Sequence, residues 1–184
     1  MYEIFGRKVS CYTIALSEEH PDYSFAKQVV DQLKIEWHFF VVDQDALYGE
    51  ENDCSGDAIV RQFYQQLNLL RVNQILACDG IDEYMGGYYD HLHKPTLETY
   101  YLYLGELMNK HLVPLHENSR DIRVFLPYLD PRLVTIYNNY EMCKRFDNDG
   151  RKKVIVNLAR NMRVPEEIIN RRKYGFCDAA KIKE

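Results

Sequence analysis

The first half of the chain alternates strand-like and helix-like segments, and this alternation limits the fold more than any other feature of the sequence. Three segments rich in β-forming or apolar residues predict strands: 9–16, 37–42 and 74–78. Two sets of apolar residues spaced four apart predict the intervening helices: Phe25, Val29 and Leu33, then Ile59, Phe63 and Leu67. Ser55 is placed to cap the second helix. Such alternation is typical of an α/β fold with a parallel sheet.

The second half of the chain, from about residue 96, has few strand signals and is predicted to be mainly helical. The pair Asp130-Pro131 predicts a helix start, because aspartate accepts hydrogen bonds from the first turn and proline fits the first helical position. Pro165, followed by two glutamates, predicts another start. A length of 184 residues is typical of one domain. We expect a single domain over residues 1–184, with an α/β part in 1–95 and a mainly helical part in 96–184.

Composition argues against several classes of function. The net charge is −5 and the basic residues are scattered, apart from 152–153 and 171–173, so no surface for a nucleic-acid backbone is indicated. The five cysteines are widely spread and form no C-x-x-C pair, which argues against a zinc site and favours a reducing, cytoplasmic location. No segment approaches the roughly 20 apolar residues that cross a bilayer. We expect neither nucleic acid nor a membrane as a partner.

An acidic turn with a glycine, residues 79–83, directly follows the third predicted strand. In open parallel sheets, ligands bind beyond the carboxyl ends of the strands, so this turn is in a position to bind one. Gly80 would let the backbone approach a phosphate, and the carboxylate of Asp82 is a ligand type that Mg²⁺ prefers. The alternative is a solvated turn in which Asp82 and Glu83 only favour the amino end of the next helix.

Two further groups of residues are weaker candidates. His91 and His93, beside Asp90, have no third ligand at metal-site spacing. The aromatic run 100–104 is more typical of helix packing than of stacking on a base. We assign no site to either group.

Several segments resemble motifs of the asparagine synthetase family. Segment 76–88, L-A-C-D-G-I-D-E-Y-M-G-G-Y, resembles the family motif L-S-G-(E or D)-G-x-D-E-x-x-G-G-Y. Segment 127–130, P-Y-L-D, resembles P-F-L-D, and segment 172–176, R-K-Y-G-F, resembles the downstream R-x-K-x-x-F element. Upstream, segments 11–16 and 23–26 are similar to the family's second strand and following helix. The resemblance covers nearly the whole chain, in the same order and with similar spacing.

This resemblance implies a fold and a reaction. The implied fold is part of an adenine-nucleotide-hydrolase-like parallel sheet, with flanking helices and a helical C-terminal lobe. The implied reaction is a carbon–nitrogen ligation that consumes ATP and forms AMP. A substrate carboxylate attacks the α-phosphate of ATP, and an amine or ammonia then displaces AMP to leave an amide. The expected ligands are therefore ATP, Mg²⁺, a carboxylate substrate and an amine or ammonia donor.

The resemblance also implies roles for particular residues. Asp82 would hold Mg²⁺ on the pyrophosphate, and Gly80 and Glu83 would bind the nucleotide with it. Lys173 would meet the α-phosphate, and Asp79 would lie near the attacking amine, since charges placed in advance stabilise the transition state. We expect Asp82 and Lys173 to lie close together at the carboxyl end of the sheet. Without the resemblance, Lys173 is one more exposed base in a basic run.

The sequence also departs from the family pattern. The pyrophosphate-binding loop S-G-G-x-D-S and its strand do not occur in residues 1–184, and neither does the family's amino-terminal glutaminase. We therefore expect the chain to act as an enzyme with a loop supplied by an upstream polypeptide, and to form a homo-oligomer or a complex with a partner chain. Ile81 is bulkier than the residue usual before D-E, and Phe125 stands where arginine commonly precedes P-F-L-D. The alternative is a non-catalytic binding subunit or a truncated remnant.

Overall fold

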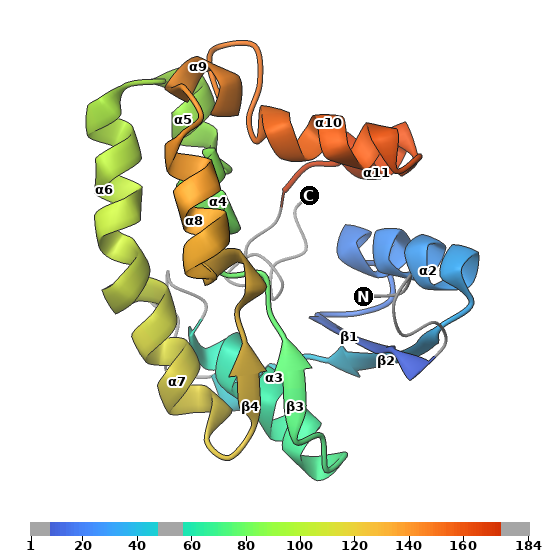
Figure 1. The fold of residues 1–184 in the computed structure, drawn as a ribbon. Coiled ribbons are helices and arrows are strands. Elements are labelled where there is room, and N and C mark those ends of the chain that lie inside the picture. Colours follow the sequence, from blue (N-terminus) through green and yellow to red (C-terminus); the bar gives the residue numbers. More distant parts are fainter. Residues whose placement is uncertain (1–7, 48–56, 174–184) are drawn as a thin grey trace. The chain divides into compact units, whose positions relative to one another are not determined.

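A computed structural model describes residues 8–47 and 57–173, so the expected cap Ser55 lies outside the described residues. The chain forms two compact units (Figure 1). The first contains the described residues up to Val72 together with Arg172 and Lys173, and the second is Asn73–Arg171. The two units meet in sequence at Val72 and Asn73. The change to mainly helical structure that the sequence predicts comes later, at about residue 96. The assignment of all 184 residues to a single domain stays a prediction.

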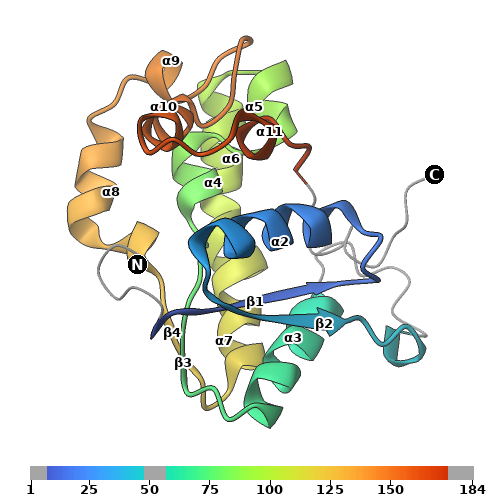
Figure 2. The same ribbon diagram turned by 90° about the vertical axis from the view of Figure 1, so that its right-hand side faces the viewer.

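The first unit is a parallel pair of strands with helices on both faces (Figure 2). Its elements are β1 (Ser10–Ala15), α2 (Pro21–Leu33), β2 (Glu36–Val41), η2 (Asp45–Leu47) and α3 (Asp57–Leu69). Tyr23 of α2 contacts Trp37 and Phe39 of β2, with ring centroids 5.0 and 4.8 Å away. Phe40 instead contacts Phe63 of α3 at 5.9 Å. Successive side chains of a strand point to opposite faces, so both faces of β2 are covered. The strands and helices predicted for this segment are confirmed.

The second unit pairs β3 (Gln74–Leu76) in parallel with β4 (Arg123–Phe125). Its helices are α4 (Ile81–Met85), α5 (Tyr89–His93), α6 (Leu97–Leu107), α7 (Val113–Ser119), α8 (Pro131–Asn138), α9 (Met142–Arg145), α10 (Lys153–Asn161) and α11 (Glu166–Ile169), with the π-helix η3 (Met108–Leu112) and the 3₁₀ turn η4 (Pro127–Leu129). The expected start at Asp130-Pro131 is confirmed, because Asp130 Oδ1 accepts from Arg132 N. No sequence pattern indicates β4, since a three-residue strand is too short to show alternation.

The chain is therefore a mixed α/β protein with two small parallel sheets. Among the described residues, β3 does not join the sheet of β1 and β2 but pairs with β4. No helix in the described part of the chain is both long enough and apolar enough to span a bilayer.

The core of the second unit is built around Phe146, which is fully buried. Its ring contacts His91, at 4.8 Å between centroids, and Tyr100, at 6.0 Å. The buried Arg145 guanidinium donates to the Tyr100 hydroxyl over 2.7 Å and lies 4.4 Å from the Tyr100 ring centroid. His91 is also fully buried, and its Nδ1 accepts from the Tyr88 backbone N–H. Tyr100, within the aromatic run of the sequence, therefore packs in the core.

We expect Phe146→Ala to lower the free energy of unfolding by about 3–5 kcal/mol, because it removes a buried ring and leaves a cavity. Ile136→Ala is the control, since Ile136 is 49% exposed and should change stability much less. Chemical denaturation of both variants measures the difference. Equal losses would contradict this description of the core.

Candidate functional site

Two of the sequence motifs meet at one edge of the β3–β4 sheet. Residues 77–88 follow β3, residues 126–130 follow β4, and the strands are parallel, so both segments leave from carboxyl ends at the same edge. The pairing extends one residue further, because Ala77 N donates to Phe125 O over 3.0 Å. Two segments about 50 residues apart in sequence are therefore neighbours in the fold.

The direct contact between these motifs is the packing of Leu129 against Gly80. Gly80 has φ +92°, a conformation that residues with a side chain rarely adopt. A Cβ atom at this position would lie 2.2 Å from Leu129 Cδ2, which is far closer than atoms can approach. The positive φ thus favours glycine here, and a side chain at this position would have to displace Leu129. This packing fixes the turn that leads into α4.

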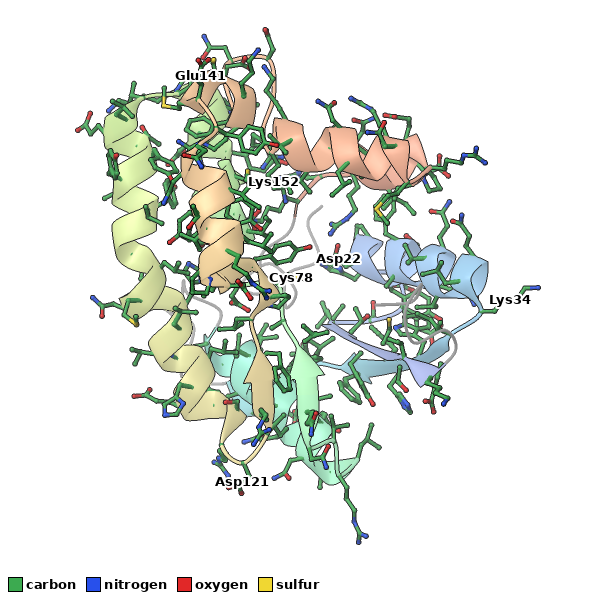
Figure 3. All side chains as sticks on the ribbon, viewed as in Figure 1. Asp22, Lys34, Cys78, Asp121, Glu141 and Lys152 are labelled. Atoms are coloured by element: carbon green, nitrogen blue, oxygen red, sulfur yellow. The ribbon has the colours of Figure 1, made fainter. Side chains whose placement is uncertain are left out.

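Asp82, in the first turn of α4, forms an ion pair with Lys152. Lys152 Nζ lies 2.9 Å from Asp82 Oδ1, and the two side chains are 31% and 22% exposed. Gly87 makes room for this carboxylate, since a Cβ there would lie 1.9 Å from Asp82 Oδ1. Lys152 precedes α10 and has a left-handed backbone with φ +49°; it is labelled in Figure 3, as is Cys78 beside the acidic turn. The sequence indicated Lys152 only as half of a basic pair, and nothing in it linked this lysine to Asp82.

Glu83 lies on the inner side of the same turn and is 3% exposed. It accepts a hydrogen bond from the Tyr88 hydroxyl, and His111 Nε2 lies 3.6 Å from Glu83 Oε1 and 3.3 Å from the Tyr88 oxygen. Burial and the hydrogen bond to Glu83 raise the pKa of Tyr88 well above its usual value, so Tyr88 keeps its proton and remains a donor. The Tyr88 ring also stacks on Tyr103, with centroids 4.3 Å apart. Glu83 is thus held by neighbours within the fold.

Asp79 lies between β3 and Gly80 and has a perturbed carboxyl group. Burial raises its pKa, and the negative charges of Glu83 and Asp82 act in the same direction. Its own backbone N–H and the charge of His111 oppose this rise, but the net effect is a raised pKa. Asp79 therefore holds a proton more tightly than an exposed aspartate, and such groups cluster at functional sites.

Lys173, the other predicted catalytic residue, lies in the first unit, whereas Asp82 lies in the second. The expected proximity of these two side chains joins residues of separate units and stays a prediction. Of the segment 172–176, residues 174–176 lie outside the described residues.

Within the described ranges, no three or more His, Cys, Asp or Glu side chains gather to form a complete metal site. Mg²⁺ that travels with a nucleotide commonly needs only one or two protein carboxylates, because phosphate oxygens and water supply the remaining ligands. Asp82 fits this donor chemistry because it is a partly exposed carboxylate next to the small Gly87, although Mg²⁺ would have to share this carboxylate with Lys152 or displace the lysine.

In comparisons with known proteins, no protein-family model matches the chain and no curated protein matches it. The resemblance to the asparagine synthetase family therefore stays a prediction from the sequence motifs.

We expect the Asp82–Lys152 pair to show a coupling free energy of about 0.5–1 kcal/mol in a double-mutant cycle of Asp82→Asn and Lys152→Gln, since both groups are partly buried. The matched cycle is Lys94–Glu98, an exposed helix pair at 3.1 Å, for which about 0.3–0.5 kcal/mol is typical. Urea denaturation of the variants gives both values. A coupling near zero for Asp82–Lys152 would show that the pair does not stabilise the turn.

Asp79→Asn should stabilise the protein at neutral pH, with the gain shrinking as pH falls. An aspartate with a raised folded-state pKa stabilises the fold fully below the ordinary value of 3.8, and this contribution is lost as pH rises through the raised pKa. Asp130→Asn should instead destabilise the protein at neutral pH, with the loss shrinking as pH falls. The hydrogen bond from the Arg132 side chain lowers the pKa of Asp130 to about 2, so the stability that the Asp130 carboxylate adds is present above pH 3.8 and is lost as pH falls toward 2. Asparagine also keeps the helix cap. Thermal melts of both variants from acidic to neutral pH measure these two changes in stability. The same pH dependence in both variants would contradict the raised pKa of Asp79.

Proposed function

We propose that this chain is an ATP-dependent, AMP-forming amide ligase of the asparagine synthetase type, acting on a carboxylate substrate and an amine or ammonia. The observation that carries this proposal is the contact between Gly80 and Leu129, which joins the two motifs at the carboxyl ends of adjacent parallel strands. Ligands of open α/β sheets bind at this kind of position. The proposed fold, part of an adenine-nucleotide-hydrolase-like sheet, rests on the same motifs.

In this proposal Asp82 and Lys152 handle the phosphate charge. Mg²⁺ bound with ATP would neutralise the negative charge of the leaving pyrophosphate, and Asp82 is the residue that would hold it. Lys152 forms an ion pair with Asp82 over 2.9 Å and places a positive charge beside this carboxylate. The Lys152 ammonium would then also be a candidate to contact a phosphate oxygen. Lys173 remains the proposed contact of the α-phosphate.

Asp79 is proposed as the base that takes a proton from the attacking amine. A carboxyl group with a raised pKa is a stronger base than an ordinary aspartate, which suits proton transfer near neutral pH. Glu83 and Tyr88 then have a positioning role: their hydrogen bond holds the start of α4, and thereby the backbone that carries Asp79, Gly80 and Asp82. Because Glu83 accepts this hydrogen bond, we propose that it supports nucleotide binding indirectly, by holding the backbone of residues 79–83 in place.

The pyrophosphate loop of the reaction is proposed to come from polypeptide outside residues 1–184, since S-G-G-x-D-S does not occur within them. Backbone N–H groups of such a loop supply most of the contacts to a pyrophosphate. The residues of the second unit would then complete a site that this loop begins.

A non-catalytic binding subunit is the second candidate, and one observation favours it. Two carboxylates of the turn already have partners within the fold: Asp82 pairs with Lys152, and Glu83 accepts from Tyr88 and lies near His111. A turn held in this way needs no Mg²⁺ to stabilise it.

We expect Asp82→Asn to lower ATP–pyrophosphate exchange about 10- to 100-fold and to raise the Mg²⁺ requirement, when the chain is assayed with the segment that supplies the loop. Asp121→Asn is the control. This variant makes the same charge change just before the amino end of β4, whereas the candidate site follows the carboxyl end of that strand. Asp121 is labelled in Figure 3. Exchange that is the same in both variants would remove Asp82 from the reaction. Nucleotide binding without any exchange would favour the binding subunit.

A further inference from the structure

The end of α9 and the connection to α10 lie against the segment that begins with α4. We call residues 145–152 the clasp; they contact residues 82–89, about 60 positions earlier in the sequence. The buried Arg145 guanidinium donates to a backbone carbonyl of α4 over 3.2 Å. Phe146 packs on Gly86, where a Cβ atom would lie 2.1 Å from Phe146 Cδ1. The two segments are therefore fixed to each other by packing as well as by hydrogen bonds.

The middle of the clasp is a tight turn that is held by Asp147. The Asp147 carboxylate pairs with Lys153 and accepts from the backbone N–H groups of Asp149 and Gly150, over 3.0 and 3.2 Å. The Asp147 N–H in turn donates to Gly150 O over 3.0 Å. The hydrogen bond from Lys153 lowers the pKa of Asp147, so this carboxylate stays charged at neutral pH. The turn thus fixes the direction of the two basic residues that follow it.

The first of these bases, Arg151, contacts the residues that follow α4. Its guanidinium donates to Gly87 O over 2.7 Å, and its Cζ lies 3.8 Å from the centroid of the Tyr89 ring. A planar guanidinium can make both contacts at once, because its N–H groups point outward in the plane while its face lies on an aromatic ring. The backbone of Gly87 is therefore held by the clasp.

Gly87 in turn determines where the Asp82 carboxylate lies. A Cβ atom on Gly87 would be 1.9 Å from Asp82 Oδ1 and 2.5 Å from its Cγ, so the carboxylate occupies the space that a side chain at 87 would fill. The Gly87 N–H also donates to Asp82 O over 2.7 Å. Lys152, the second base, lies 2.9 Å from the same Oδ1 atom. Two adjacent bases thus act on Asp82, Lys152 directly and Arg151 through Gly87.

We propose that Arg151 is a positioning residue of the candidate site: by holding the Gly87 carbonyl, it fixes the place of the Asp82 carboxylate. The inference rests on the proposed function for the role of Asp82 toward Mg²⁺, whereas the positioning is a property of the fold. Mg²⁺ demands nearly ideal octahedral geometry, so a small displacement of its carboxylate weakens binding. Both glycines of the motif have a place in this arrangement, since Gly86 admits Phe146 and Gly87 admits the carboxylate.

The ion pair between Asp82 and Lys152 tests this positioning without a ligand. Its coupling free energy, measured by urea denaturation in the Asp82→Asn and Lys152→Gln cycle, should fall to about half or less in an Arg151→Lys background. Lysine keeps the positive charge but lacks the planar group that meets carbonyl and ring together, so the loss reports geometry. Arg160→Lys is the matched background. Arg160 pairs with Glu166 at 2.7 Å from the last turn of α10, and the coupling should stay unchanged there.

Gly87→Ala tests the second step of the argument. The added methyl group takes the space of the Asp82 carboxylate, so the coupling with Lys152 should disappear while the chain stays folded. Gly105→Ala makes the same change where a Cβ meets no atom within 4 Å, and it should leave the coupling intact. Coupling that survives either Arg151→Lys or Gly87→Ala would overturn the proposal.

The Mg²⁺ requirement of ATP–pyrophosphate exchange separates positioning from general stability. With the loop-supplying segment present, Arg151→Lys should raise the Mg²⁺ concentration for half-maximal exchange about tenfold, with little change in the rate at saturating Mg²⁺. A residue that only stabilises the fold would lower the maximal rate and leave this concentration unchanged, and that result would also overturn the proposal. Arg160→Lys should match the unmodified chain in both quantities. An unmodified chain without exchange would contradict the proposed function, and the ligand-free coupling would then decide the role of Arg151 alone.

Discussion

The parallel pairing of β3 with β4 determines which residues can meet in the second unit. Because the strands run in the same direction, the turn after β3 and the turn after β4 leave from the same edge. Leu129 can then pack on Gly80, and this contact sets the backbone that begins α4. The positions of Asp79, Asp82 and Glu83 follow from that start. A different partner for β3 would separate the motifs and remove the candidate site.

The three carboxylates of the acidic turn lie in different environments, and among the described residues only Asp82 and Glu83 have side-chain partners. Asp82 has a lysine, Glu83 has a tyrosine hydroxyl and a histidine, and burial leaves Asp79 with a raised pKa. Carboxylates are costly to bury without such partners. Neighbouring acids in unlike environments can do different chemistry, since one stays charged for a metal while another takes up a proton. This division is the physical basis for the roles proposed for Asp82 and Asp79.

Sequence patterns predicted the elements whose signals are local. β1 and β2 carry runs of β-forming residues, and α8 begins with a capping aspartate and a proline, so each could be located from neighbouring residues. β4 could not, because its three residues show no period and its strand character comes from pairing with β3. Lys152 was missed for a similar reason: it reaches Asp82 across 70 positions of sequence through a left-handed backbone that no local pattern indicates. Pro114 was the available signal for the π-helix that carries His111.

The proposed function requires nucleotide phosphates to bind at the shared edge of β3 and β4. Mapping of backbone amide chemical shifts during titration with Mg²⁺ and ATP tests it most directly, at ligand concentrations high enough to populate a weak complex. We predict that the largest changes fall on residues 78–88 and 128–130, with smaller changes at Lys152. If these amides stay unperturbed while others shift, or if nothing shifts at saturating ligand, the edge of β3 and β4 is not a nucleotide site.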